Sequence, residues 1–307
     1  MDGGVGSAIR PAPRPNPKPP GLATPGWFAL ALAALLAAPA ARADGKEEVS
    51  AWRTLADGVE YATFTLATEP ESGDGLLHVV RIDPSRAELR ALVASAGDGK
   101  SRTAQGWLKE GGLAVAINAG MYQSDGRSNV GYFRSGAHQN NARWNAYRSA
   151  FAFGPRRGGI PAAVLVDLDP PDSGRSAAAQ AALDRDYDTV IQNLRLIKGT
   201  ASGVWSPGAK RWSEAAIAED DRGHILFLFA RTPLSMSDWI ERVLALPLHV
   251  ARAMHVEGGP LASLSIRAGD LSLDLAGSFE SGFSPYDRNA RQAPIPNVIG
   301  VRASPNP

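Results

Sequence analysis

Alternating polar and apolar residues predict strands in the N-terminal part of the chain. VEYATFTLA at 59–67 alternates with period two and is rich in aromatic and β-branched residues. LLHVVRID at 76–83 is a short apolar run between a glycine and a proline, and AELRALVAS at 87–95 alternates again. Because these stretches follow one another closely, we expect an antiparallel meander here.

Two stretches carry the start and stop signals of helices. RTAQGWLKEGG has a candidate N-cap at Ser101 or Thr103 and ends in a glycine pair. SMSDWIERVLAL can be capped by Ser235 and repeats apolar residues on one face. We therefore predict helices over 102–110 and 236–246.

Apolar runs in the rest of the chain predict more strands. They lie at 148–155, at 162–169 and on both sides of Asp-Asp-Arg-Gly at 220–223, which is a hairpin signal. The Asp-, Pro- and Ala-rich stretch at 170–185 predicts an exposed loop with a short helix. Together these elements predict an α+β fold, a strand-rich mixed sheet system with a few helices in a single mature domain.

The first 43 residues have the pattern of an export signal. Basic residues precede GWFALALAALLAAPAARA, an apolar stretch too short to span a bilayer, and Ala-Arg-Ala at 41–43 fits the A-x-A cleavage pattern. We predict a signal peptide with a Pro-rich leader over 1–43, cleavage near Ala43-Asp44, and a secreted or periplasmic domain over 44–307. The alternative is an uncleaved membrane anchor.

The composition narrows the classes of protein. The chain has 307 residues, 44% of them hydrophobic and 21% charged, which suits a globular domain with a sizeable core. Its formal net charge of +1 becomes −2 when the leader, with four basic residues and one acidic residue, is set aside. A near-neutral chain is not an obvious partner of nucleic acid or of a membrane surface. The absence of cysteine excludes disulfides, thiolate metal sites and a cysteine nucleophile.

Two apolar strands end in the same manner. AVAINAG at 114–120 delivers Asn118, and AMHVEGG at 253–259 delivers Glu257, each followed by small residues. Polar side chains at strand ends, beside glycines that let a ligand approach the backbone, are a common way to build a site. The alternative is that both side chains only cap turns.

Basic residues in VIQNLRLIKG at 190–199 are candidates for binding an anion. Arg195 and Lys198 stand beside apolar residues, and partly buried cations need a carboxylate or a bound anion. They could meet Glu257, a phosphate or a carboxylate substrate, or they could form an ordinary ion pair. The chain lacks a GxSxG elbow and a Gly-rich phosphate loop, and its five histidines are scattered, so no metal is predicted.

Four stretches occur in the order seen in phosphodiester glycosidases. They are INAGMYQSDGRSNVGYFRSG, LRLIKG, a hairpin with EDDRG, and HVEGGPLASL. From about Trp52 to Val301 the chain resembles that family. The resemblance implies a secreted hydrolase that cleaves a sugar-1-phosphodiester, the glycosidic bond to phosphate, in a glycan or cell-envelope polymer. It implies a carbohydrate or sugar-phosphate substrate and no cofactor.

The resemblance also implies roles for particular residues. Glu257 would be the base or nucleophile, Asn118 would donate to a sugar hydroxyl or to the phosphate, and either Asp221 or Glu214 would be the second carboxylate. The predicted catalytic residues are Glu257, Asp221 and Asn118. The predicted substrate-binding residues are Arg195, Lys198, Gly120, Tyr122, Gly258, Gly259 and His255.

The chain departs from the family pattern at several positions. Glu257 stands where an aspartate is usual, Pro260 stands where glycine or serine is expected, and Gln-Asn-Leu at 192–194 replaces Ser-Gly-Pro. A site altered in this way could bind a phosphorylated cell-surface glycan without cleaving it. A non-catalytic binding module is therefore the alternative function, and a structural protein with a vestigial site is a further one.

Overall fold

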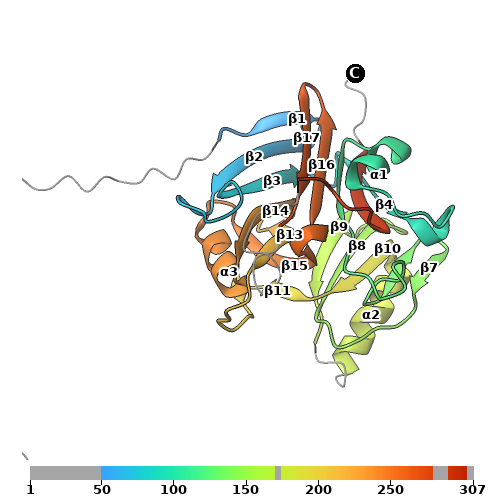
Figure 1. Cartoon of the computed structure of the whole chain (residues 1–307). Helices are drawn as coiled ribbons and strands as arrows, with labels where there is room; N and C mark the ends of the chain where they lie inside the picture. Colours follow the sequence, from blue (N-terminus) through green and yellow to red (C-terminus); the bar gives the residue numbers. More distant parts are fainter. Residues whose placement is uncertain (1–49, 170–173, 279–289, 303–307) are drawn as a thin grey trace, which may run out of the picture. The chain divides into compact units, whose positions relative to one another are not determined.

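The computed structural model describes residues 50–169, 174–278 and 290–302. The predicted signal over 1–43 lies outside these residues. In the described part, strands form three sheets, accompanied by three α-helices (Figure 1). The strand-rich α+β class is thus confirmed. The recorded strand pairs are all antiparallel, where we expected mixed sheets.

The largest sheet has eight strands. In spatial order they are β1 (Arg53–Ala56), β2 (Val59–Thr65), β3 (Leu76–Ile82), β14 (Ile225–Leu234), β13 (Trp212–Asp220), β15 (Val250–Gly258), β11 (Arg195–Lys198) and β12 (Ser202–Gly203). The predicted hairpin is confirmed, because β13 and β14 pair with each other and Gly223 takes a φ of +85° in the turn between them.

Two five-stranded sheets complete the framework. One has the order β7 (His138–Asn141), β6 (Phe133–Ser135), β10 (Tyr187–Asn193), β8 (Ser149–Pro155) and β9 (Ala163–Asp167). The other has the order β17 (Leu271–Ala276), β16 (Ser263–Ala268), β5 (Val115–Asn118), β18 (Asn297–Arg302) and β4 (Glu88–Val93). Strands β5 and β15 carry the two strand ends that the sequence singled out.

Two of the three described α-helices begin where the sequence predicted caps. They are α1 (Ala104–Gly111), α2 (Gly174–Asp186) and α3 (Met236–Ala245). The Thr103 hydroxyl accepts a hydrogen bond from the Gly106 N–H, and the Ser235 hydroxyl accepts one from the Asp238 N–H. Each cap satisfies a backbone donor that the first helical turn leaves free.

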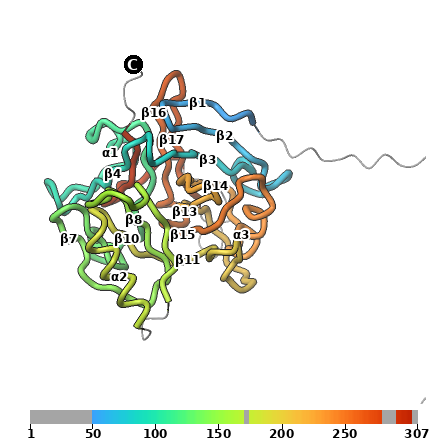
Figure 2. The backbone as a smooth tube through the Cα atoms, turned by 180° about the vertical axis from the view of Figure 1, so that it is seen from behind, coloured from blue at the N-terminus to red at the C-terminus, as the bar shows by residue number. Residues whose placement is uncertain are grey.

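One hydrophobic core joins the three sheets. Val80 on β3, Ile117 on β5 and Phe151 on β8 are fully buried in a single cluster. Burying side chains of this size stabilises the fold by roughly 1.5–3 kcal/mol each. A second cluster lies on the other face of the large sheet, where Trp239 and Val243 of α3 pack against it. Both views place α3 beside β13 and β15 (Figure 2).

Two parts of the chain differ from the sequence prediction. Strands β2 and β3 pair as the predicted meander requires, and β1, which the sequence did not predict, pairs with β2, but β4 leaves this sheet and pairs with β18 in another one. The apolar stretch at 190–199 is also divided, because β10 and β11 belong to different sheets and Leu194 lies between them. In both places neighbouring strands of the sequence belong to different sheets that face the same core.

Candidate active site

The end of β5 contacts the segment that follows the end of β15. The Asn118 side chain at the end of β5 donates from Nδ2 to the Leu261 carbonyl (3.0 Å) and accepts at Oδ1 from the Ser263 N–H (2.7 Å). Those two residues follow the turn after Glu257. Asn118 is buried, and its amide braces the chain that leaves the catalytic candidate. A contact between Asn118 and substrate stays a prediction.

Glu257 is a buried carboxyl with an unusual affinity for protons. Its side chain is 7% exposed, and Oε1 accepts a hydrogen bond from the Gly258 N–H (3.1 Å). Burial raises its pKa to about 7, helped by the nearby Glu214 and opposed by His255 and the Gly258 N–H. A carboxyl with a pKa near neutrality can both accept and return a proton at the pH of most natural environments.

Beside Glu257 lies a buried glutamate–histidine pair. Glu214 Oε1 is 2.6 Å from His255 Nδ1, and Glu214 Oε2 accepts a hydrogen bond from Trp212 Nε1 (3.0 Å). Burial raises the pKa of the fully buried Glu214. Burial would lower the pKa of His255, but the charge and hydrogen bond of Glu214 raise it on balance. The pair therefore holds a proton readily.

The second nitrogen of His255 is available for other contacts. Nδ1 is occupied by Glu214, whereas Nε2 has no hydrogen-bond partner among the described residues. A ring fixed at one nitrogen by a carboxylate can present an N–H at the other. Such an N–H suits an anionic oxygen.

An irregular strand sets the directions of these side chains. On β15, Glu257 is opposite Ala215 while His255 is opposite Ala216, so Val256 is an extra residue in the strand. Residues two apart normally point to the same face of a sheet. The bulge therefore turns Glu257 relative to His255, as bulges near active sites often do.

Neighbouring side chains leave no room for a Cβ at two of the predicted glycines. A Cβ on Gly120 would lie 2.4 Å from Asn129 Oδ1 and 3.1 Å from Asn193 Nδ2. A Cβ on Gly258 would lie 2.7 Å from the Trp212 ring, so this glycine leaves room for the indole that reaches Glu214. Gly259 has a φ of +65°, which a residue with a Cβ adopts only with strain.

Two buried amides beside Gly120 have unused hydrogen-bonding atoms. Asn129 Oδ1 and Asn193 Nδ2 are buried without a partner. The half-buried Tyr122 pairs with Asn129 in an isolated β-bridge, and its pKa is raised by burial and by the charge of Glu257. An unpaired acceptor and an unpaired donor at one place are suited to a bound polar group.

Two predicted site residues lie away from Glu257. Asp221 follows β13 six residues beyond the partner of Glu257, roughly 20 Å along the strand at 3.3 Å per residue, and its side chain is 59% exposed. Lys198 is exposed at the far end of β11. Of the two alternatives for the second carboxylate, the structure brings only Glu214 to Glu257.

Arg195 is held near the site by an acidic neighbour. Its Nη1 is 3.6 Å from Asp167 Oδ1, and its Nε is buried without a hydrogen-bond partner. It lies on the strand next to β15, opposite Met254. The ordinary ion pair foreseen as an alternative for Arg195 therefore exists.

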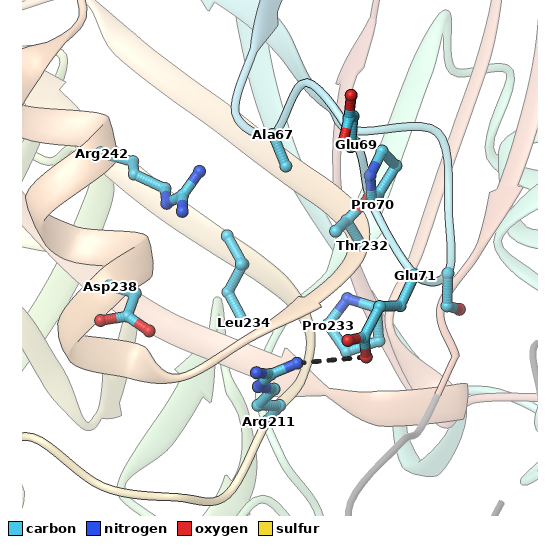
Figure 3. A pocket seen from close by; sticks show the side chains of 11 residues that line it. Ala67, Glu69, Pro70, Glu71, Arg211, Thr232, Pro233, Leu234, Asp238 and Arg242 are labelled. Carbon is cyan, nitrogen blue, oxygen red and sulfur yellow. Dashed lines mark ion pairs between the residues drawn. The ribbon is translucent and has the colours of Figure 1, made fainter. Parts of the chain in front are cut away.

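A different hollow lies between α3 and the segment at 67–72 (Figure 3). Its volume is about 240 Å³, and no predicted site residue lines it. Glu71 and Arg211 form an ion pair there (3.5 Å), and Arg242 donates to the Leu66 carbonyl. Because these charges are already engaged within the protein, this hollow is a weaker candidate than the carboxyl cluster.

Sequence reasoning missed Trp212 and the amides of Asn129 and Asn193. Trp212 stands two residues before Glu214 on one strand, so period two places both side chains on the same face. That spacing was a usable signal for Trp212. The amides gave none, because they come from segments far apart in the sequence.

The comparisons with known proteins show the family of the chain. The model of the family "NAGPA: Phosphodiester glycosidase" matches residues 111–302, which include both strand ends. The chain belongs to the phosphodiester glycosidase family. The family cleaves glycosidic bonds, so its substrates are carbohydrates. None of the curated proteins compared with the chain matches it.

Two solved structures share the fold. The catalytic domain of zebrafish N-acetylglucosamine-1-phosphodiester alpha-N-acetylglucosaminidase, auto-inhibited by pro-peptide, aligns with a TM-score of 0.58 at 11% identity, over 84% of this chain and 88% of that one. A hypothetical protein from Synechocystis aligns with a TM-score of 0.51 at 14% identity, over 80% of this chain. That match spans 62% of the Synechocystis chain. In the described part of our chain, no helix has the length and apolar character needed to cross a membrane.

Proposed function

We propose that this protein hydrolyses a sugar-1-phosphodiester in a glycan or cell-envelope polymer. The observation that carries the proposal is Glu257, a buried carboxyl with a pKa of about 7 beside the Glu214–His255 pair. A site that only binds a glycan has no need of a carboxyl that titrates near neutrality. Membership of the phosphodiester glycosidase family supports the same reaction class.

In the proposed reaction, water attacks the anomeric carbon. Glu257 accepts the proton of the water, or acts first as the nucleophile, and the bond between the anomeric carbon and the phosphate oxygen breaks. The electron pair of that bond leaves with the phosphate. The proton held by His255 and Glu214 stabilises the added negative charge through His255 Nε2. The products are a free sugar and a phosphate monoester.

The bond that breaks can be identified with labelled water. Purified protein, from residue 44 onward, is incubated with sugar-1-phosphodiesters in ¹⁸O water, and the products are analysed by mass spectrometry. We expect the label in the anomeric hydroxyl of the released sugar. A label in the phosphate would mean attack at phosphorus and would overturn the proposed chemistry.

A variant and its control test the assigned carboxyl. Glu257→Gln should lose at least a thousandfold in turnover, because the amide cannot take a proton. Glu241→Gln, on an exposed position of α3, is the matched control and should keep parental turnover. Glycan binding without hydrolysis by the parent would instead support the binding-module alternative.

We also propose that the chain is exported, with the signal over 1–43 removed. The support is the sequence pattern that ends near Ala43. Expression in a Gram-negative host, followed by fractionation and N-terminal sequencing, tests this. A protein that stays in the cytoplasm at full length would refute it.

A further inference from the structure

A second pocket opens one strand away from His255. It has a volume of about 380 Å³, in the range that holds small ligands, and Tyr147, Arg148, Leu194, Arg195 and Trp205 are among its lining residues. The Leu194 carbonyl accepts a hydrogen bond from the His255 N–H (2.9 Å). The pocket therefore begins roughly 5 Å from the backbone of His255.

The pocket carries positive charge without a balancing carboxylate in its lining. Arg148 is exposed, and its side chain has no ion pair or hydrogen bond among the described residues. Arg195 also lines the pocket, with 17% of its side chain exposed, and it is paired with Asp167. Two guanidinium groups, of which Arg148 has its donors unused, form a site for an anion such as a carboxylate or a phosphate.

An aromatic ring forms another wall. Trp205 donates from Nε1 to the Arg195 carbonyl (2.9 Å), which fixes the orientation of its indole. Next to it, Val204 is 38% exposed, and it is the large hydrophobic side chain that the described part of the chain leaves most open. An indole and an exposed apolar side chain provide a surface against which the apolar face of a sugar ring can pack.

The wall that carries Arg148 is held in place from inside the protein. Gln192 is fully buried, and its Nε2 donates to the carbonyls of Asn145 (3.0 Å) and Tyr147 (2.7 Å). Its Oε1 accepts hydrogen bonds from the Asn145 N–H (3.1 Å) and the Tyr132 N–H (3.2 Å). One side chain thus fixes the loop before β8, so that the pocket exists before any ligand arrives.

A chain of contacts connects the pocket to the proposed catalytic groups. The Trp205 ring lies 6.2 Å from the Trp212 ring in an edge-to-face arrangement. Trp212 in turn donates to Glu214, which bonds His255. Side-chain contacts therefore link the lining of this pocket to the Glu214–His255 pair.

We propose that this pocket is the aglycone subsite, and that it selects an acidic sugar on the far side of the scissile phosphate. The proposal rests on the proposed phosphodiester hydrolysis and adds the class of substrate, a polyanionic glycan. The sugar ring packs on Trp205, and its acidic group binds Arg148, with the positive charge of Arg195 in the same lining. Neutral aglycones would fill the same space without the charge contacts.

The test compares three glucose-1-phosphodiesters. Their aglycones are methanol, methyl glucoside and methyl glucuronoside, the two sugars being linked through O4. We expect kcat/KM for the acidic aglycone to exceed that for the neutral sugar at least tenfold at low salt. A fourth substrate, with methyl glucoside 6-phosphate as aglycone, shows whether a phosphate is accepted in place of the carboxylate.

Two variants assign the preference to this pocket. Arg148→Gln should bring the ratio of acidic to neutral aglycone close to one. Arg143→Gln, an exposed arginine that does not line the pocket, should keep the parental ratio. Equal rates for acidic and neutral aglycones in the parent, or an unchanged ratio in Arg148→Gln, would overturn the proposal.

A binding measurement separates this proposal from the proposed function. Saturation-transfer NMR with methyl glucuronoside and methyl glucoside detects the subsite without any turnover. Binding of the glucuronoside that Arg148→Gln abolishes, with no diester cleaved, would reject the hydrolase and support the pocket. Cleavage of diesters with no binding of the glucuronoside and no acidic preference would support the hydrolase and reject the pocket.

Discussion

Replacing Glu257 by Gln should stabilise the protein in alkaline solution while it removes activity. The pKa of Glu257 rises from 4.5 to about 7 on folding, chiefly through burial. Between these two values the folded state binds more protons than the unfolded state. Stability of the parent must therefore fall as the pH rises through this window.

The size of the effect follows from the shift. One pKa unit corresponds to about 1.4 kcal/mol, so a shift from 4.5 to about 7 corresponds to about 3 kcal/mol. The loss is absent below pH 4.5, where the carboxyl is neutral in both states, and complete above pH 7. Gln has nearly the same shape and is neutral throughout, and its Oε1 can still accept from the Gly258 N–H.

The assay is urea unfolding followed by tryptophan fluorescence at pH 4.5, 6 and 8.5. We expect equal stability of parent and Glu257→Gln at pH 4.5, and an advantage of up to about 3 kcal/mol for the variant at pH 8.5. Glu241→Gln, which alters an exposed carboxyl, should follow the parent at every pH. If the difference between Glu257→Gln and parent were the same at all three pH values, the raised pKa would be refuted.

Three further substitutions probe the site and its packing. Trp212→Phe keeps an aromatic ring but removes the N–H that donates to Glu214. Because a hydrogen bond to a charged group is lost, kcat/KM should fall about tenfold or more, and parental kinetics would contradict this role of Trp212. Gly120→Ala places a Cβ 2.4 Å from Asn129 Oδ1 and should cost about 1–3 kcal/mol in thermal unfolding, so an unchanged Tm would show that the amide moves freely. Glu214→Gln should lose at least tenfold in kcat/KM whereas Asp221→Asn should not, and the opposite order would restore Asp221 as the second carboxylate.

Much of this architecture could be predicted from local patterns. Period-two alternation located β2 and β4, a short apolar run located β3, and the Ser235 cap located the start of α3, because these signals depend only on neighbouring residues. The sequence also singled out Asn118 and Glu257 as side chains of one site, but it did not predict that the Asn118 amide would bind the backbone after Glu257. Local signals were sufficient wherever the relevant contacts are themselves local.

The second carboxylate could not be chosen from the sequence. Glu214 lies in β13, two residues after Trp212, and Asp221 lies in the turn that follows, two residues before Gly223. What separates them is the pairing of β13 with β15, which places Glu214 beside Glu257 and Asp221 at the other end. Register is a property of two strands that are distant in sequence, so no local pattern contains it.

The extra residue in β15 has a consequence for protein design. Because Val256 turns Glu257 away from the direction of His255, the relative orientation of these two side chains is a property of the backbone rather than of residue identity. Grafting His-Val-Glu onto a regular strand of another scaffold would put both side chains on one face and lose the arrangement. The unit that must be transplanted is therefore the bulged pair of strands. When a relative lacks the extra residue, a sequence alignment with this chain should place the gap at Val256.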